Sequence, residues 1–199
     1  MAPDQRIGFL RRRIIAPVGE IVLYIAASLD GYIADRDGGV GWLERFNTPG
    51  EDHGYVEFLS QAGSVIMGAT TYEQELSRQE WPYGARPTWV FTHRRLPKPD
   101  DADVRFVSGI AAEHIEEIRN TTDRAVYLAG GAHVVEQFMA EGAVDRMRLF
   151  IVPLLLGEGI RLLAASGPTQ AELLGTKTYR TGLVELHYRL NGHPPPGQG

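Results

Sequence analysis

The chain has 199 residues, of which 43% are hydrophobic and 23% charged, as expected for one soluble globular domain with a substantial core. Its net charge of −5 argues against a nucleic-acid partner, and the arginines at positions 11–13 are interpreted as part of a solvated extension. No apolar run reaches the roughly 18 residues that span a bilayer, and no signal-peptide pattern is present. The absence of cysteine excludes disulfides and thiolate catalysis and fits a cytoplasmic location.

Residues 1–19 are predicted to be an N-terminal extension, residues 20–191 one domain, and the Pro- and Gly-rich residues 192–199 a flexible tail. Within the domain, short apolar segments predict strands, and segments with helical spacing predict helices. The predicted strands cover residues 21–27, 64–67, 88–92, 104–107, 125–129 and 147–156. The predicted helices cover residues 52–61, 70–76, 111–119 and 132–141.

This alternation of strands and helices predicts an α/β fold with a mixed, mostly parallel sheet flanked by helices. Near the end of the chain, residues 178–181 and 183–190 are separated by Gly182, and the second segment alternates polar and apolar residues. That pattern predicts an antiparallel C-terminal hairpin.

The segment after residues 125–129 contains Gly130 and Gly131, followed by the predicted helix that starts at Ala132. Glycines let the backbone turn sharply and approach an anionic group closely, and a helix N-terminus offers free N–H groups. A glycine pair after a strand is also common in plain tight turns, so a phosphate site and a simple turn both remain open.

Two further strand ends carry similar chemistry. Gly68 is followed by Thr70 and Thr71, whose hydroxyls could either bind a phosphate or cap the next helix. The other strand end reads Thr92-His93-Arg94-Arg95, which suits a phosphomonoester but also describes a solvated basic loop. Ligands of α/β sheets gather at the carboxyl ends of strands, so the three segments could hold one dinucleotide.

Two acids are candidates for catalysis. Asp52 lies three residues before Tyr55 and is predicted to share the inward face of a helix. There its carboxylate could contact a heterocycle or deliver a proton to it. The alternative is that Asp52 caps the first turn of the helix. Asp30, in an Asp-Gly pair, is favoured as a turn residue. The six histidines show no metal-ligand spacing, so no metal site is predicted and most of them are interpreted as surface or capping residues.

Five segments resemble, in order, the dihydrofolate reductase superfamily, most closely the reductase domain of the riboflavin-biosynthesis deaminase/reductases and its stand-alone relatives. They are Ile25-Ala26-Ala27-Ser28-Leu29-Asp30-Gly31-Tyr32-Ile33-Ala34, Val65-Ile66-Met67-Gly68, Leu128-Ala129-Gly130-Gly131-Ala132, Gly142-Ala143-Val144-Asp145-Arg146-Met147 and Pro153-Leu154-Leu155-Leu156-Gly157-Glu158-Gly159. The resemblance covers residues 21–190 and implies a dihydrofolate-reductase-like fold that binds NADPH, and a homodimer with the apolar run at residues 149–156 as a candidate contact.

The resemblance also implies roles for individual residues. Gly68, Ala69, Thr70 and Thr71 would hold the pyrophosphate region, and Thr92, His93 and Arg94 the adenosine 2′-phosphate. The pyrophosphate near the nicotinamide would meet Gly130, Gly131, Ala132, His133 and Val134, while Ala26 and Ala27 would line the nicotinamide pocket. The helix carboxylate of dihydrofolate reductases aligns with Asp52, and Trp42 aligns with a Trp beside their active-site loop.

Two departures from the family pattern bear on function. Ala69 stands where the family often has Arg, so Arg94 or Arg95 would have to supply the preference for NADPH. Residues 148–153 lack the Thr that dihydrofolate reductases use near the pterin. The leading hypothesis is therefore an NADPH-dependent reductase of a small heterocycle, of the 5-amino-6-(5-phosphoribosylamino)uracil reductase type. A dihydrofolate reductase and a non-catalytic NADPH-binding module are the alternatives.

Overall fold

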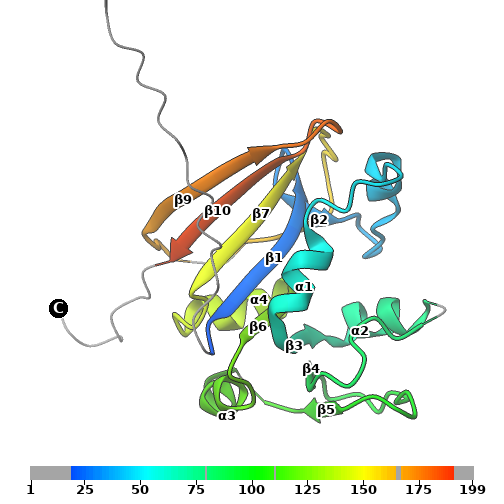
Figure 1. Cartoon of the computed structure of the whole chain (residues 1–199), viewed down its shortest axis with the longest axis vertical. Coiled ribbons are helices and arrows are strands. Elements are labelled where there is room, and N and C mark those ends of the chain that lie inside the picture. The colour runs from blue at the N-terminus through cyan, green and yellow to red at the C-terminus, as the bar shows by residue number, and fades with distance from the viewer. Residues whose placement is uncertain (1–18, 79, 110, 165–166, 191–199) are drawn as a thin grey trace, which may run out of the picture.

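A computed structural model describes residues 19–190 except 79, 110, 165 and 166 (Figure 1). One large sheet runs through the domain, in the order β5-β4-β3-β6-β1-β7-β10-β9. The contacts from β5 through β7 are all parallel, whereas β10 is antiparallel to both β7 and β9. The predicted mixed, mostly parallel sheet with an antiparallel C-terminal hairpin is confirmed.

The large sheet is built from β1 (Ile21–Ser28), β3 (Ala62–Gly68), β4 (Thr88–Phe91), β5 (Val104–Val107), β6 (Ala125–Gly130), β7 (Arg146–Val152), β9 (Ala171–Thr178) and β10 (Val184–Leu190). A small second sheet pairs β2 (Tyr32–Ala34) with β8 (Ile160–Arg161). The helices are α1 (Tyr55–Gln61), α2 (Ala69–Leu76), α3 (Ile115–Asn120) and α4 (Ala132–Ala140), with 3-10 helices at Gly41–Phe46 and Ala111–Glu113.

The alternation of side chains along the strands divides the interior into two cores, one on each face of the sheet. On β1, Ile21 and Leu23 join the core that α3 and α4 cover, while Val22 and Tyr24 join the core under α1 and α2. Figure 1 shows α1 lying across the face of the sheet opposite α4. Helices on both faces explain why the central strands are apolar on both sides.

Several predicted boundaries were wrong. The strand predicted at 147–156 ends at Val152, because Pro153 has no N–H to donate to the sheet. The hairpin turn lies at residues 179–183, and its first strand is β9, so residues 178–181 are mostly turn. Helix α1 starts at Tyr55 rather than at residue 52. The predicted extension and tail fall almost wholly on residues outside the described part of the chain.

The strand ends that were expected to bind a ligand lie at one edge of the sheet. Met67 of β3 pairs with Gly130 of β6, and Gly68 pairs with Phe91 of β4. Since neighbouring parallel strands end at the same edge, the segments that follow Gly68, Phe91 and Gly130 emerge together. No helix in the described part of the chain is long and apolar enough to cross a membrane.

Candidate functional site

Glycines bring the N-termini of α2 and α4 together at the carboxyl edge of the sheet. A Cβ on Gly68 would lie 3.1 Å from Val134 Cγ2 and 3.7 Å from the Gly131 nitrogen. A Cβ on Gly131 would lie 3.6 Å from Thr71 Oγ1, and the Gly130–Gly131 peptide bond is cis. The close approach is tightest at Gly68, where a side chain would crowd Val134, and the two helix starts share this edge.

Both helix starts lack a side-chain cap. Gly68 and Gly131 occupy the N-cap positions of α2 and α4, and neither helix receives a side-chain hydrogen bond there. The first N–H groups of each helix therefore need an outside acceptor, and the helix dipoles favour a negative one. The hydroxyl residues Thr70 (exposed) and Thr71 (half-buried) stand in the first turn of α2. This chemistry fits a pyrophosphate.

The other residues expected at these helix starts differ in what they offer. Ala69 and Ala132 contribute backbone N–H groups, since their side chains are methyl groups. Val134 is 4% exposed and packs in the core beneath Gly68, so its role is packing. The His133 ring is exposed, with Nε2 placed 3.0 Å from Gln137 Nε2.

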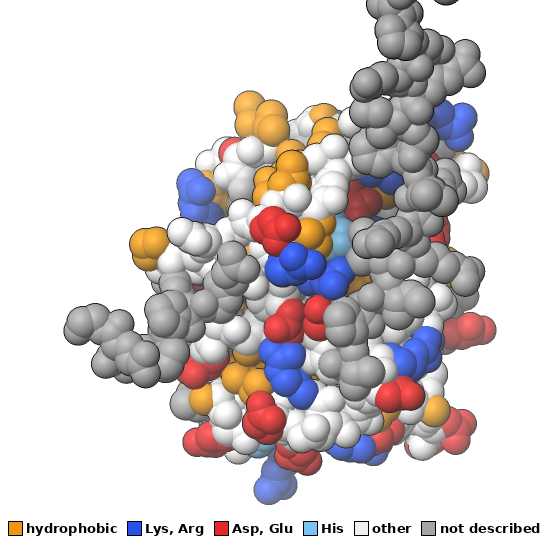
Figure 2. Space-filling view, turned by 60° about the vertical axis from the view of Figure 1, so that its left-hand side comes forward, with side chains coloured by type: hydrophobic (Ala, Val, Ile, Leu, Met, Phe, Trp, Pro, Cys, Tyr) orange, Lys and Arg blue, Asp and Glu red, His pale blue; other side chains and the backbone are white. Residues whose placement is uncertain are grey.

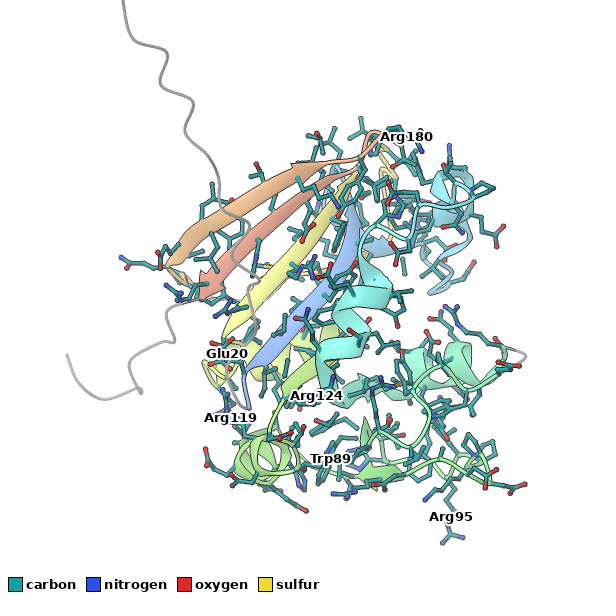
Figure 3. All side chains as sticks on the ribbon, in the orientation of Figure 1. Glu20, Trp89, Arg95, Arg119, Arg124 and Arg180 are labelled. Carbon is teal, nitrogen blue, oxygen red and sulfur yellow. The ribbon has the colours of Figure 1, made fainter. Side chains whose placement is uncertain are left out.

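The strand end after β4 carries a cation that already has a partner. Thr92 Oγ1 accepts the Arg94 N–H at 2.9 Å, and His93 is exposed. The Arg94 guanidinium donates two hydrogen bonds to the Glu73 carboxylate of α2, one of them 2.8 Å long, which raises the pKa of Arg94. Arg95, by contrast, points away from the body of the protein (Figure 3). Arg94 is thus the cation held beside α2.

A cleft of about 330 Å³ opens beside this edge, on the face of the sheet that carries α1. Its floor is formed by the sheet and its wall by the segment from the first 3-10 helix to α1. The floor residues are Tyr24, Ile25, Ala26, Tyr127, Ala129 and Phe150, with Leu183 beside them, and the wall residues are Leu43, Phe46, Asn47, Asp52, His53 and Tyr55. The five Tyr and Phe rings in this lining suit a planar ligand.

Of the two predicted nicotinamide residues, only Ala26 lines the cleft. Ala27 is 2% exposed and is the next residue on β1, so its methyl group lies on the opposite face of the sheet. Ala26 lies on the strand next to β6, whose end is Gly130. The cleft therefore lies beside the proposed phosphate edge.

Three tyrosines line the cleft. Burial raises the pKa of Tyr24, Tyr55 and Tyr127, so their phenols remain protonated at neutral pH. The Tyr55 hydroxyl is hydrogen-bonded with those of Tyr83 and Tyr127, and Tyr24 donates to the carbonyl of His53 at 3.2 Å. Protonated phenols can donate to carbonyl oxygens or ring nitrogens of a ligand.

Asp52 lies in the cleft wall but not on a helix face. It precedes α1 and is exposed, which corrects the prediction that it shares the inward face of the helix. Its two oxygens accept the N–H groups of Gly54 and Val56, each at 2.9 Å, and these bonds lower the pKa of Asp52. The carboxylate therefore caps the start of α1 and remains ionised while facing the cleft.

Asp30 and Trp42 lie outside the lining of the cleft. The Asp30 carboxylate accepts hydrogen bonds from the Ser28 hydroxyl and from the N–H groups of Leu156 and Gly157, joining the turn after β1 to the loop after β7. Trp42 is half-buried in the 3-10 helix whose Leu43 and Phe46 form the wall. Its Nε1 is buried without a partner among the described residues. Trp42 thus belongs to the helix that forms part of the cleft wall, whereas Asp30 fixes a turn whose residues do not line the cleft.

The sequence interpretation missed His53. It lines the cleft and is the one non-glycine residue with positive φ, 55°, in the described part of the chain. Its only sequence signal is its place between Asp52 and Gly54 in a turn. Among the described residues, no group of His, Asp and Glu side chains forms a metal-binding cluster.

A comparison with protein-family models matches residues 77–185 to the RibD C-terminal domain. The chain belongs to this family. The chain is 37% identical to the uncharacterized protein YwjB of Bacillus subtilis over 84% of this chain and 95% of the relative. The riboflavin biosynthesis protein RibD of Corynebacterium ammoniagenes is 26% identical, and the match covers 72% of this chain but only 46% of that protein.

Solved structures agree with this membership. A putative riboflavin biosynthesis protein from Shewanella sp. PV-4 has a TM-score of 0.77 and 26% identity, covering 86% of this chain and 99% of that one. Dihydrofolate reductase from Enterococcus faecalis, complexed with NADP(H), has a TM-score of 0.60 at 14% identity, covering 87% and 98% of the two chains. The resemblance to riboflavin-type reductase domains and the dihydrofolate-reductase-like fold are confirmed, and a reductase of this family is the supported class.

Proposed function

We propose that the protein is an NADPH-dependent reductase of a small heterocyclic substrate, of the 5-amino-6-(5-phosphoribosylamino)uracil reductase type. The observation that carries the proposal is the adjacency of two sites of different chemistry. An edge with two uncapped helix starts suits a pyrophosphate, and beside it lies an aromatic cleft with protonated phenols.

The cofactor fits the residues at the edge. The N–H groups that follow Gly68 and Gly131, with the hydroxyls of Thr70 and Thr71, would hold the pyrophosphate, and Arg94 would meet a 2′-phosphate. The nicotinamide would lie toward Ala26, where the edge meets the cleft. When bound, the reduced nicotinamide supplies a hydride to the substrate.

The cleft supports the substrate class. The rings of Tyr24, Phe46 and Phe150 offer apolar faces to a planar heterocycle, while the hydroxyls of Tyr55 and Tyr127 offer donors. Uracil-like and pterin-like rings both present carbonyl oxygens and ring nitrogens as acceptors.

The test is a titration with NADPH and NADH followed by nicotinamide fluorescence, with Arg94→Ala as the variant. Micromolar binding of NADPH, weakened by the substitution, supports the cofactor site. Reduction of 5-amino-6-(5-phosphoribosylamino)uracil, followed by the loss of NADPH absorbance, supports the substrate class. Failure to bind either nucleotide removes the reductase proposal.

Dihydrofolate is the second substrate to assay. The chain is 30% identical to dihydrofolate reductase HdrB of Haloferax volcanii over 120 residues, 60% of this chain and 59% of that protein. Turnover of dihydrofolate together with tight methotrexate binding would favour this alternative. NADPH binding without oxidation by pterins, aminouracils or carbonyl compounds would favour a non-catalytic binding module.

A further inference from the structure

We infer that His53 is the proton donor of the reaction, an inference that rests on the proposed reductase function. Transfer of a hydride to a C=N or C=O carbon moves the electron pair of the double bond onto nitrogen or oxygen. That atom must then receive a proton, and a side chain in the cleft can supply it.

The acids predicted from the sequence are poor sources of this proton. The Asp52 carboxylate faces the cleft but accepts two backbone N–H groups and remains ionised. Asp30 lies outside the cleft and is held by three hydrogen bonds. The phenols in the cleft are protonated, but burial disfavours the phenolate that a transfer would leave behind. An imidazolium that gives up its proton leaves a neutral ring instead, so the transfer creates no new buried charge.

The protein holds His53 in place at several points. Its N–H donates to Glu51 Oε1 at 3.0 Å, and its carbonyl accepts from the hydroxyls of Tyr24 and Tyr179 at 3.2 and 2.8 Å. These contacts come from the loop before α1, from β1 and from the hairpin turn, and they fix a φ of 55° that side chains disfavour. Backbone strain held by surrounding contacts is a common property of functional residues.

The imidazole ring of His53 is also held in a defined orientation. Nε2 lies 3.1 Å from Thr181 Oγ1, and the ring packs edge-on against Tyr179 at a centroid distance of 5.0 Å. No hydrogen bond to Nδ1 is made by the described residues. With Nε2 held by Thr181, an imidazolium has its second N–H at Nδ1, and this is the hydrogen that we assign to the transfer.

Charged and titratable groups lie near His53. Glu51 and Asp52 lie in the same loop as His53, and Tyr24 and Tyr179 contact its carbonyl. Lys177 packs on the Tyr179 ring that His53 contacts, Arg148 packs on the Tyr24 ring, and Glu185 accepts from the Tyr179 hydroxyl. The two nearest in sequence are acids, and the charge of His53 lowers the pKa of Asp52, which is an attraction between the two groups. Arg148 and Glu185 form an ion pair at 2.6 Å, so their charges largely cancel. Asp52 is therefore the electrostatic partner of the donor.

The proposed step balances. The substrate carbon gains the hydride, the former double-bond electrons form a new N–H or O–H bond with the proton from His53 Nδ1, and the ring is left neutral. The ring then regains a proton from water at the open side of the cleft. Because the protonated ring is the active form, the reduction rate should fall as pH rises.

His53→Gly separates this role from folding. Glycine adopts φ of 55° without strain and keeps the N–H and carbonyl that make three of the hydrogen bonds. We expect NADPH affinity to stay within about twofold of the wild type. The substrate is whichever of 5-amino-6-(5-phosphoribosylamino)uracil and dihydrofolate the wild type reduces, and kcat for it should fall about a hundredfold. Added imidazole should restore part of the rate. His53→Asn, which also tolerates this φ, should stay impaired and fill the space that imidazole needs.

A readout independent of turnover is the NMR spectrum of ¹⁵N-labelled imidazole rings in the unreactive complex of the wild type with NADP⁺ and the unreduced substrate. The expected result is a His53 ring protonated on both nitrogens. A neutral ring there, or a His53→Gly variant with kcat within about threefold of the wild type and the same pH profile, overturns the inference. Failure of the wild type to bind NADPH is a different result and removes the proposed function itself.

Discussion

The Arg94 guanidinium and the Glu73 carboxylate form a two-point ion pair between the loop after β4 and helix α2. Both side chains are about half exposed, at 57% and 41%. A 2′-phosphate would therefore compete with Glu73 for Arg94, and the acid would repel it. In the proposed reductase, the preference for NADPH over NADH would therefore depend on both members of the pair.

This relationship predicts opposite effects of two substitutions. Glu73→Gln should tighten NADPH binding about three- to tenfold, because it removes a competing negative charge, and Arg94→Ala should weaken it by about tenfold. Neither change should alter NADH binding, since NADH lacks the 2′-phosphate. Fluorescence titrations at low and high salt measure the affinity of each variant for both nucleotides. Equal effects on the two nucleotides would show that the pair does not contact the 2′-phosphate.

A second prediction concerns the glycine edge. A Cβ at Gly68 would lie 3.1 Å from Val134 Cγ2, whereas one at Gly175 in β9 meets nothing within 4 Å. Gly68→Ala should push α4 away from α2 and weaken NADPH binding about tenfold or more, because the two helix starts no longer converge. Gly175→Ala is the matched control and should bind normally. Normal binding by both variants would refute a cofactor site at this edge.

The hydrogen bonds of Asp30 make stability depend on pH. The Ser28 hydroxyl, followed by the N–H groups of Gly157 and Leu156, lowers the pKa of Asp30 from 3.8 to about 2. A carboxyl with a lowered folded-state pKa stabilises the fold above its unfolded pKa and loses that contribution as pH falls through about 2. Asp30→Asn should therefore lower the melting temperature at pH 7 by a few degrees and have little effect near pH 2.

The control for this experiment is Asp100→Asn. Asp100 is exposed and makes no hydrogen bond or ion pair with its side chain in the described part of the chain. Calorimetry across pH should show no pH-dependent difference for it. A pH-independent loss in Asp30→Asn would indicate a steric effect instead.

A fourth prediction compares two ion pairs on the C-terminal strands. Arg148 and Glu185 are 2.6 Å apart with side chains 21% and 8% exposed, while Arg189 and Glu172 are 2.7 Å apart and 47% and 56% exposed. Glu185→Gln should reduce the free energy of unfolding by about 3 kcal/mol, since it leaves a half-buried guanidinium unpaired. Glu172→Gln should change it by less than about 1 kcal/mol. Urea unfolding measures the free energy of unfolding of both variants. Similar losses in the two would contradict the idea that burial makes the Arg148–Glu185 pair more important.

The fifth prediction concerns the expected homodimer. Leu155, in the apolar run proposed as a contact, is 67% exposed and lies in the loop after β7 that bonds to the turn after β1. Leu155→Asp should dissociate a dimer, whereas Val56→Asp, at an equally exposed position on α1, should not. Sedimentation of the wild type at micromolar concentration provides the test. A wild-type mass of about 22.0 kDa, that of one chain, would remove the dimer.

The order of strands and helices could be predicted because the central segments are apolar on both faces, as in β3 and β6. Strand β9 was missed because Ala171–Thr178 is exposed along most of its length and has no clear alternation. Its strand conformation depends on pairing with β10, a contact that local patterns do not contain.

Part of the candidate site could be located from the sequence, and part could not. The turns at Gly68 and Gly130 follow apolar strands and could be located from the sequence, and the fold places them side by side. The cleft depends on contacts between Tyr24, His53 and Tyr179, which lie far apart in the chain. Sequence spacing could place Asp52 near a helix but could not show that its carboxylate binds the backbone there.

The uncapped starts of α2 and α4 would link the folded state of the protein to the proposed cofactor. An anion bound there would complete the first turns of both helices at once, and it would do so only in the folded chain. Amide hydrogen exchange should therefore slow in both helices when NADPH is added. In a cell, the lifetime of this protein would then follow the supply of the nucleotide, so that starvation for cofactor removes the enzyme as well as its activity.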